Sequence, residues 1–160
     1  MAEDVKDVKE VKEVKEVKEL KDGRGIEELR DVMVIEDEAE VAETLEMYLK
    51  NMDCFRNVVH SYDGTTAISK LANQAFSLIL IDLNIPRRSG LDVLKYIADH
   101  EGNDIKDVIM VSGAFEKKSI TKAMQYGAKH FLVKPFDEEA FREKVVKALE
   151  MEMSDFHFIT

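Results

Sequence analysis

The stretch Leu78-Ile79-Leu80-Ile81 constrains the fold more than any other part of the chain, because four apolar residues follow one another without polar alternation. Such a run predicts a short strand that is buried on both faces of a sheet. It ends in Asp82, and aspartate is depleted in strands and rarely buried without a partner. Open α/β sheets bind their ligands at the carboxyl ends of the strands. We therefore expect Asp82 to be the chemical centre of the protein.

Four more predicted strands alternate with segments of helical periodicity. Apolar runs predict strands at 32–35, 108–111 and 131–133, and the segment 55–61, with Val58-Val59 at its centre, predicts the other. Apolar residues recur every three or four positions after each run, so each strand is expected to lead into a helix. The fourth helix spans about 116–126 and stops at Gly127, and the last begins after the cap residue Asp137. Five buried strands alternating with five helices predict a doubly wound parallel sheet of the α/β class.

The composition argues against several classes of protein. A net charge of −10 disfavours nonspecific binding to nucleic acid or to an acidic membrane. No apolar run approaches the roughly 18 residues that a membrane span requires. Cys54 is the single cysteine, so the chain forms no internal disulfide, which suits a cytoplasmic protein.

The chain is expected to divide into a charged repeat tail and linker at 1–25, one domain at 26–151, and a short tail at 152–160. Residues 5–19 repeat Val-Lys-Glu or a near copy with a period of three. Because an α-helix turns by about 100° per residue, these valines form no continuous stripe. We expect a frayed helix or disorder there, and a coiled-coil or partner-binding segment is the alternative. One interpretation of the last tail is that it folds back on the domain through Phe156, Phe158 and Ile159.

Charged and hydroxyl side chains follow several of the predicted strands. Glu36 and Asp37 come after the first strand, Asp82 after the third, Ser112 after the fourth and Lys134 after the fifth. Two carboxylates about 4 Å apart repel by about 4 kcal/mol at a surface-like dielectric, so such a cluster needs a cation. Hard oxygen ligands without His or Cys favour Mg²⁺. A metal, a carboxylate and an ammonium together have the charge layout for phosphoryl transfer.

These residues resemble the response-regulator receiver domain over about Asp31 to Leu149. The similarity rests on Glu36-Asp37, on Asp82 within LILIDLNIPRRSGLDVL, on Ser112 within IMVSGAF, and on Lys134-Pro135 within FLVKPF. The spacings agree too, with 30 residues from Asp82 to Ser112 and 52 from Asp82 to Lys134. Chemotaxis receivers have strand order 2-1-3-4-5, so the resemblance implies a flavodoxin-like (βα)5 fold with that order.

The resemblance also implies a role for each of these side chains. Asp82 would accept phosphate from a histidine kinase or a phosphotransfer protein, and Lys134 would pair with the phosphoryl group through a segment with a cis peptide bond to Pro135. Ser112 would hydrogen-bond a phosphate oxygen, and Phe131 stands where many members carry a switching aromatic residue. Magnesium would be held by Glu36, Asp37, Asp82 and the backbone carbonyl of Asn84.

The function implied by the resemblance is a stand-alone switch in two-component or phosphorelay signalling, with no DNA-binding output domain. Such a protein is not an enzyme beyond its own phosphorylation and dephosphorylation. The added phosphoryl charge, about −1.5 to −2, would bias a surface made of the fourth helix, the fifth strand and the last helix toward a downstream protein. No nucleic acid and no membrane is expected among the partners.

Two other classes of function stay open from the sequence alone. The first is a small hydrolase or a nucleotide-cofactor protein on the same fold. A hydrolase with an aspartyl nucleophile usually needs a second Asp two residues on, where Asn84 stands here. A nucleotide-cofactor site needs Gly-x-Gly-x-x-Gly after the first strand, where Glu36-Asp37-Glu38 would repel a pyrophosphate. The other alternative is a scaffold, in which the repeat tail binds partners and the receiver modulates it.

Overall fold

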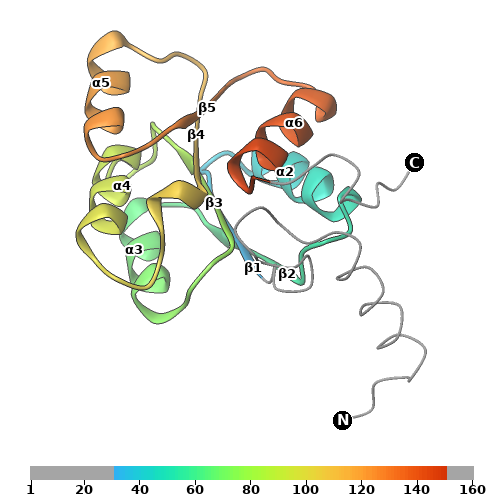
Figure 1. The fold of residues 1–160 in the computed structure, drawn as a ribbon, viewed down its shortest axis with the longest axis horizontal. Helices are drawn as coiled ribbons and strands as arrows, with labels where there is room; N and C mark the ends of the chain where they lie inside the picture. The colour runs from blue at the N-terminus through green and yellow to red at the C-terminus, as the bar shows by residue number, and fades with distance from the viewer. Residues whose placement is uncertain (1–30, 151–160) are drawn as a thin grey trace.

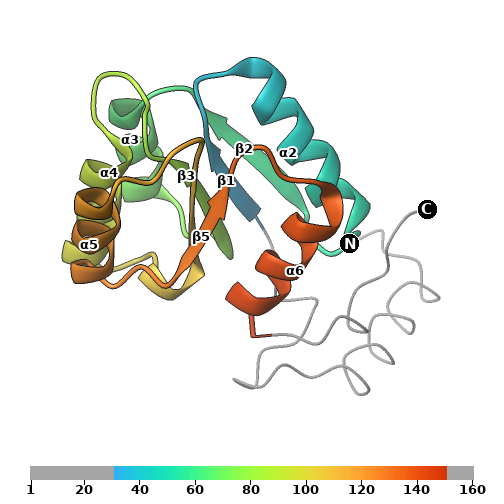
Figure 2. The ribbon, with the colours of Figure 1, turned by 90° about the horizontal axis from the view of Figure 1, so that it is seen from above.

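Five parallel strands form one sheet in the computed structural model, which describes residues 31–150 (Figures 1 and 2). Their order is β2-β1-β3-β4-β5, which confirms the predicted fold. The predictions for 1–25 and 152–160, including the scaffold alternative and the folding back of Phe156, lie outside the described residues. The strands are β1 (Asp31–Ile35), β2 (Asn57–Ser61), β3 (Leu78–Asp82), β4 (Val108–Ser112) and β5 (His130–Val133).

Helices cover both faces of this sheet. Helices α2 and α6 lie on one face, and α3, α4 and α5 lie on the other (Figure 2). Within residues 31–150, no helix is long and apolar enough to cross a membrane, and α2, the longest, has 13 residues. The helices are α2 (Ala39–Asn51), α3 (Gly64–Asn73), α4 (Gly90–Asp99), α5 (Lys117–Gln125) and α6 (Glu138–Ala148), with a short 3₁₀ helix η2 (Ile105–Asp107) that the sequence pattern did not predict.

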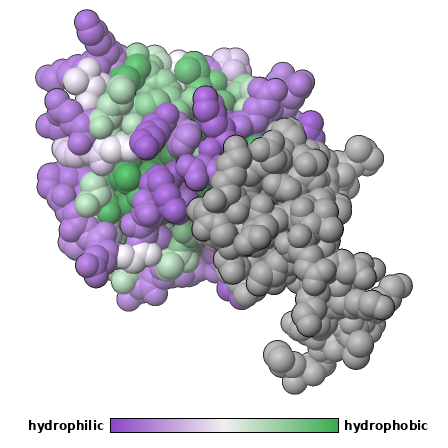
Figure 3. Space-filling model, in the orientation of Figure 1, coloured by the Kyte–Doolittle hydropathy of each residue, from purple (hydrophilic) through white to green (hydrophobic). Residues whose placement is uncertain are grey.

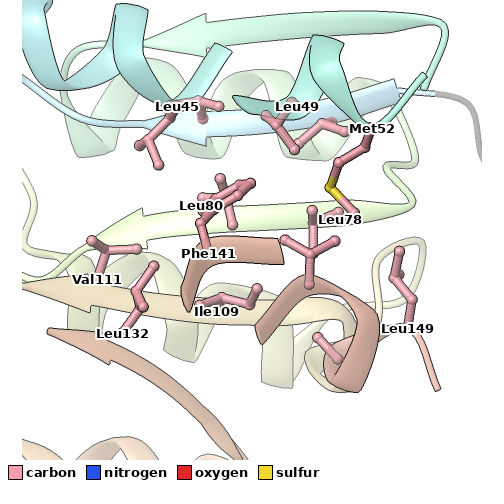
Figure 4. Packing of buried hydrophobic residues seen from close by; sticks show 14 of the residues in the cluster. Leu45, Leu49, Met52, Leu78, Leu80, Ile109, Val111, Leu132, Phe141 and Leu149 are labelled. Carbon is pink, nitrogen blue, oxygen red and sulfur yellow. The ribbon is translucent and has the colours of Figure 1, made fainter. Parts of the chain in front are cut away.

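The three central strands are buried along their whole length, as their uninterrupted apolar runs predict. Alternate residues of each strand point into one of two cores, and Figure 4 shows the core between the sheet and helices α2 and α6. Phe141 of α6 is fully buried in this core beside Leu80 and Ile109. The two-sided burial holds the carboxyl ends of β1, β3 and β4 in fixed register.

The prediction that all five strands are buried is wrong for the two outer ones. Strand β2 begins with the exposed Asn57, and β5 ends with the exposed Val133. Both are edge strands of the sheet, so each has a strand on one side only. The predicted start of β2 at residue 55 is also two residues early. Phe55 packs against the core beside α2, and Arg56 reaches Asp31 at 3.3 Å.

Local caps fix where the helices begin. The Asp137 carboxylate accepts a hydrogen bond of 2.8 Å from the backbone of Ala140, which confirms it as the cap of α6. Ser89 and Asp92 form a reciprocal capping box at the start of α4. Gly127 follows α5 with a φ of 106°, the left-handed conformation expected of a helix-ending glycine.

The side chain of Asn103 joins three separate pieces of backbone. It accepts a hydrogen bond of 2.8 Å from the backbone of Phe76 and donates to the carbonyls of Leu71 (3.1 Å) and Gln74 (3.0 Å). We expect Asn103→Ala to lower the free energy of unfolding by about 1–3 kcal/mol, because these backbone groups lose their partner. Urea unfolding measures this change.

Asn73→Ala provides the control, since the Asn73 side chain is exposed and bonds only the Ser69 carbonyl of its own helix. It should change the stability by less than about 0.5 kcal/mol. Equal losses for the two variants would contradict the role given to Asn103.

Candidate functional site

The carboxyl ends of β1, β3 and β5 bring three predicted site residues into contact. Asp82 is the last residue of β3 and is 5% exposed, and Glu36 directly follows β1 and is 1% exposed. The ammonium of Lys134, just after β5, lies 2.6 Å from Asp82 Oδ2 and 2.8 Å from Glu36 Oε2. One lysine therefore bridges two buried carboxylates from different strands.

The remaining carboxylate oxygens also have hydrogen-bond donors. Asp82 Oδ1 accepts a hydrogen bond of 2.9 Å from the backbone of Asn84, and Glu36 Oε1 accepts one of 3.1 Å from the backbone of Glu38. Both donors lie two residues beyond their acceptors, so each loop turns back over the carboxylate that precedes it. Buried carboxylates require such partners, because the desolvation of an unpaired charge is very costly.

Crowding of the carboxylates changes the acid–base chemistry of the pocket. Burial, and then the hydrogen bond to the Asp82 side chain, raise the pKa of Glu36 to about 7, although the Lys134 ammonium acts in the opposite direction. Burial alone would lower the pKa of Lys134, but its hydrogen bonds to Asp82 and Glu36 raise it, so this lysine stays charged. The pocket has more negative charge than a single lysine neutralises.

Asp37 adds a third carboxylate on the solvent side of the pair. Oxygen atoms of Glu36, Asp37 and Asp82 lie within 4.8 Å of one another, close enough to hold one metal ion, and Asp37 is exposed. The donor set contains oxygen only, without His or Cys, which suits Mg²⁺. These residues thus fit a small divalent cation at the edge of the pocket.

The other predicted residues lie near the site but outside the ion-pair network. Ser112 is fully buried, and its hydroxyl donates to the Ala114 carbonyl (3.0 Å) and accepts from the Ala114 backbone N–H (3.3 Å). The half-buried ring of Phe131 packs edge-on against Phe115, with 5.4 Å between ring centroids. Asn84 is exposed. Ser112 therefore lies on β4 and Phe131 on β5, and neither is hydrogen-bonded to the carboxylates.

Backbone hydrogen bonds hold the loops of the site to the end of β4. The backbone of Leu83 donates to the Val111 carbonyl at 3.0 Å, and the backbone of Lys134 donates to the Ser112 carbonyl at 2.8 Å. The Lys134–Pro135 peptide bond is cis, as the resemblance implied. Lys134 is therefore attached directly to β4, and Asp82 is one residue away from such an attachment.

Two glycines that we did not predict as site residues hold the loop after Asp82. A Cβ on Gly90 would lie 2.3 Å from the Asp82 carbonyl oxygen, and one on Gly64 would lie 2.1 Å from the Arg88 carbonyl oxygen. The backbones of both glycines donate to this loop, to Leu83 at 2.9 Å and to Pro86 at 3.1 Å. The available signal was the cap–glycine pair at each helix start, Asp63-Gly64 and Ser89-Gly90.

The fold and this site define a class of protein: a doubly wound α/β domain with an acidic, lysine-bridged pocket at the carboxyl edge of its sheet. The model of the response regulator receiver domain family matches residues 32–146. The chain belongs to this family, and such domains act in two-component signalling rather than in metabolic catalysis.

Known relatives and structures agree with this assignment. The chain is 33% identical to the transcriptional regulatory protein MalR of Bacillus subtilis over 70% of its own length, but it spans only 47% of MalR. It is 28% identical to the chemotaxis protein CheY of Pseudomonas aeruginosa, over 74% of this chain and 95% of CheY. The receiver domain of the sensor histidine kinase PA1611 from the same species has a similar fold, with a TM-score of 0.66 and 20% identity. That match covers 74% of this chain and 96% of the receiver, which is described with a magnesium ion in its active site cleft.

We expect Gly90→Ala to destabilise the protein by about 1–3 kcal/mol, because its methyl group would overlap the backbone of Asp82 and Leu83. Gly113→Ala is the matched control, since a Cβ there meets no atom within 4 Å. It should change the stability by less than about 0.5 kcal/mol. Urea unfolding of both variants measures the difference, and a neutral Gly90→Ala would show that α4 does not hold the Asp82 backbone.

The raised pKa of Glu36 predicts a pH dependence of stability in the absence of divalent cations. An unfolded glutamate releases its proton near 4.5, whereas folded Glu36 keeps it to about 7, so the folded state binds more protons between these values. The contribution of Glu36 to stability should therefore be largest below about 4.5 and should be lost as the pH rises to about 7.

Urea unfolding of the wild type and of Glu36→Gln, in a chelating buffer, measures this contribution as a difference at each pH. The free energy of unfolding of the wild type should fall relative to that of Glu36→Gln as the pH rises through this window. Glu38→Gln serves as the control because Glu38 is an exposed neighbour. A wild-type minus Gln difference that is constant with pH would contradict the prediction.

Proposed function

We propose that Asp82 is the phosphoryl acceptor of this receiver domain and that the reaction depends on Mg²⁺. The observation that carries the proposal is the Lys134 bridge between Asp82 and Glu36 in a pocket with a third carboxylate. Family membership supports an aspartyl acceptor, and Asp82 is the one carboxylate of the three that terminates a central strand. A buried strand end gives the acceptor a fixed position, which favours an in-line displacement.

In the proposed reaction, a carboxylate oxygen of Asp82 attacks the phosphorus atom of the donor. A new oxygen–phosphorus bond forms while the bond from phosphorus to the donor's leaving atom breaks, so the carboxylate becomes an acyl phosphate. Lys134 already touches the acceptor at 2.6 Å and is placed to pair with the transferred group. Glu36 and Asp37 would hold Mg²⁺, which when bound neutralises charge on the phosphoryl oxygens. The backbone carbonyl of Asn84 is the further ligand that the family resemblance implies.

The magnesium proposal is supported by the chemistry of the pocket. Three carboxylates converge there, and Lys134 supplies a single positive charge. The receiver of PA1611 is described with magnesium in its active site cleft, and we extend that property to this chain. The oxygen-only donor set is consistent with the extension.

The proposed donor is a histidine kinase or a phosphotransfer protein. A groove of about 470 Å³ borders Lys134 at the carboxyl edge of the sheet, between the start of α2 and the segment after β5. Val41, Pro135 and Phe136 give this groove an apolar lining. The net charge of −10 makes nucleic acid a poor partner. A cytoplasmic location and the absence of an attached output domain stay predictions from the sequence.

For the output, we propose that phosphorylation acts on the surface formed by α5, β5 and α6. The new phosphoryl group would recruit the Ser112 hydroxyl, which now bonds Ala114 at the start of the β4–α5 loop. Phe131 lies on β5 and packs against Phe115 from that same loop. Movement of the loop would therefore be transmitted to the aromatic pair and to the surface around it.

We expect one acid-labile phosphoryl group on the wild type after incubation with acetyl phosphate and Mg²⁺, and none on Asp82→Asn, because an amide is a poor nucleophile. Intact-protein mass spectrometry measures the addition. Asp92→Asn is the control, since this exposed aspartate only caps α4, and it should be phosphorylated like the wild type. Asp37→Asn should require more Mg²⁺ for the same yield. The proposal is wrong if Asp82→Asn accepts phosphate at the wild-type rate.

A further inference from the structure

Two large apolar side chains are exposed on α5 and on the edge strand β5. Met124 on α5 is 60% exposed, and Val133 on the edge strand β5 is 55% exposed. They are two of the four large apolar residues exposed within residues 31–150. In Figure 3, apolar residues gather on the side of the molecule where α5 and β5 lie, between hydrophilic side chains. We call the surface that includes Met124, Val133, Lys129, Lys144 and Lys147 the β5 face.

The β5 face carries positive charge in a protein whose net charge is −10. Lys129 precedes β5, and Lys144 and Lys147 lie on α6. Burial lowers the pKa of His130 at the start of β5, and the charges of Lys144, Lys147 and Lys129 lower it further. None of the three forms an ion pair within the described part of the chain. The cluster is therefore open to an anionic group.

The chain leaves the described region at this same place. Glu150 is the last described residue, and its carboxylate also acts on His130. The next ten residues are Met-Glu-Met-Ser-Asp-Phe-His-Phe-Ile-Thr, which contain two acids and no Lys or Arg. Ten extended residues reach up to about 33 Å, whereas the four residues of β5 span only about 13 Å. The segment is long enough to run the whole length of β5 to Val133.

We propose that residues 151–160 bind in cis to the β5 face, with Glu152 and Asp155 near the lysines and Phe156 and Phe158 over Val133 and Met124. The complementarity is double: acids meet unpaired lysines, and aromatic rings cover exposed apolar side chains. The regulatory consequence rests on the proposed function, since this surface is the one assigned to the downstream partner. The segment would then compete with that partner.

Attachment to α6 favours this segment over an unlinked ligand, because a short tether gives an effective concentration in the millimolar range. The Val-Lys-Glu repeat is less suited to the lysines. It carries both signs of charge, with a lysine beside almost every acid. A helix of this sequence would also show no apolar stripe. The acidic and aromatic segment next to the face is the better match.

The mode of binding is constrained by the handedness of the fold. Helices α4 and α5, which lead from β3 to β4 to β5, lie on one face of the sheet, whereas α6 lies on the opposite face. A parallel sixth strand beside β5 would therefore need a left-handed crossover through α6, which is rare. We infer that the segment binds through its side chains and does not add a parallel strand to the sheet.

The test compares solvent access to the Met124 and Val133 methyl groups in the full, unphosphorylated chain, by NMR relaxation with a soluble paramagnetic probe. Phe156→Ser with Phe158→Ser should raise the relaxation of both methyls several-fold. Lys144→Glu with Lys147→Glu should do the same. Val11→Ser with Val14→Ser, in the repeat, should leave both unchanged, and so should Lys117→Glu with Lys118→Glu at the start of α5.

Unchanged relaxation in the Phe156/Phe158 variant would show that the β5 face is open and would overturn the proposal. A rise in the Val11/Val14 variant alone would assign the face to the repeat and would overturn it equally. Urea unfolding checks that each variant is folded. The measurement needs no phosphoryl donor and no intact acceptor chemistry, so its failure is distinct from a failure of the phosphoryl-acceptor assignment.

Discussion

The site depends on the Lys134 ammonium between two buried carboxylates. Strands β1 and β3 are neighbours, so Glu36 and Asp82 come close simply because the sheet forms. Two carboxylates this close repel each other by several kcal/mol unless a cation lies beside them. Strand β5, which lies two strands from β3 and three from β1, supplies this cation. Removal of one partner of a buried ion pair leaves an uncompensated charge. A change of charge on Asp82 or Glu36 therefore acts on Lys134, and through it on the end of β5.

Close packing adds to the hydrogen bonds that hold the backbone around the pocket. Gly90 and Gly64 begin their helices against the loop that follows Asp82, with no room for a Cβ at either position. Arg87 in this loop has a φ of 70°, a conformation that non-glycine residues rarely adopt. The two helix starts hold the loop that follows Asp82 in place.

The sequence predicted those parts of the structure that are encoded locally. Apolar runs and helical periodicity located the strands and helices, and Asp137 and Gly127 marked helix ends through their own backbone chemistry. Features that depend on distant segments were not predictable in this way. The exposure of β2 and β5 follows from their place in the strand order, and the tight approach of Gly90 to Asp82 follows from the packing of α4. Lys134 was placed at the pocket correctly, but its bridge to Glu36 was not foreseen, because no local pattern specifies a pair 98 residues apart.

The short distance along β5 between the pocket and the β5 face suggests how the two communicate. Lys134 directly follows Val133, and Phe131 lies on the same strand, so a displacement of the lysine acts on the apolar surface without any intermediate element. The Lys134 backbone is also bonded to Ser112 on β4. A phosphoryl group on Asp82 would change the charge that Lys134 faces by about −1, and the hydroxyl of Ser112 is the neighbouring donor on the same edge. Both responses converge on β5, which has a strand on only one side and is therefore the least constrained strand next to the pocket.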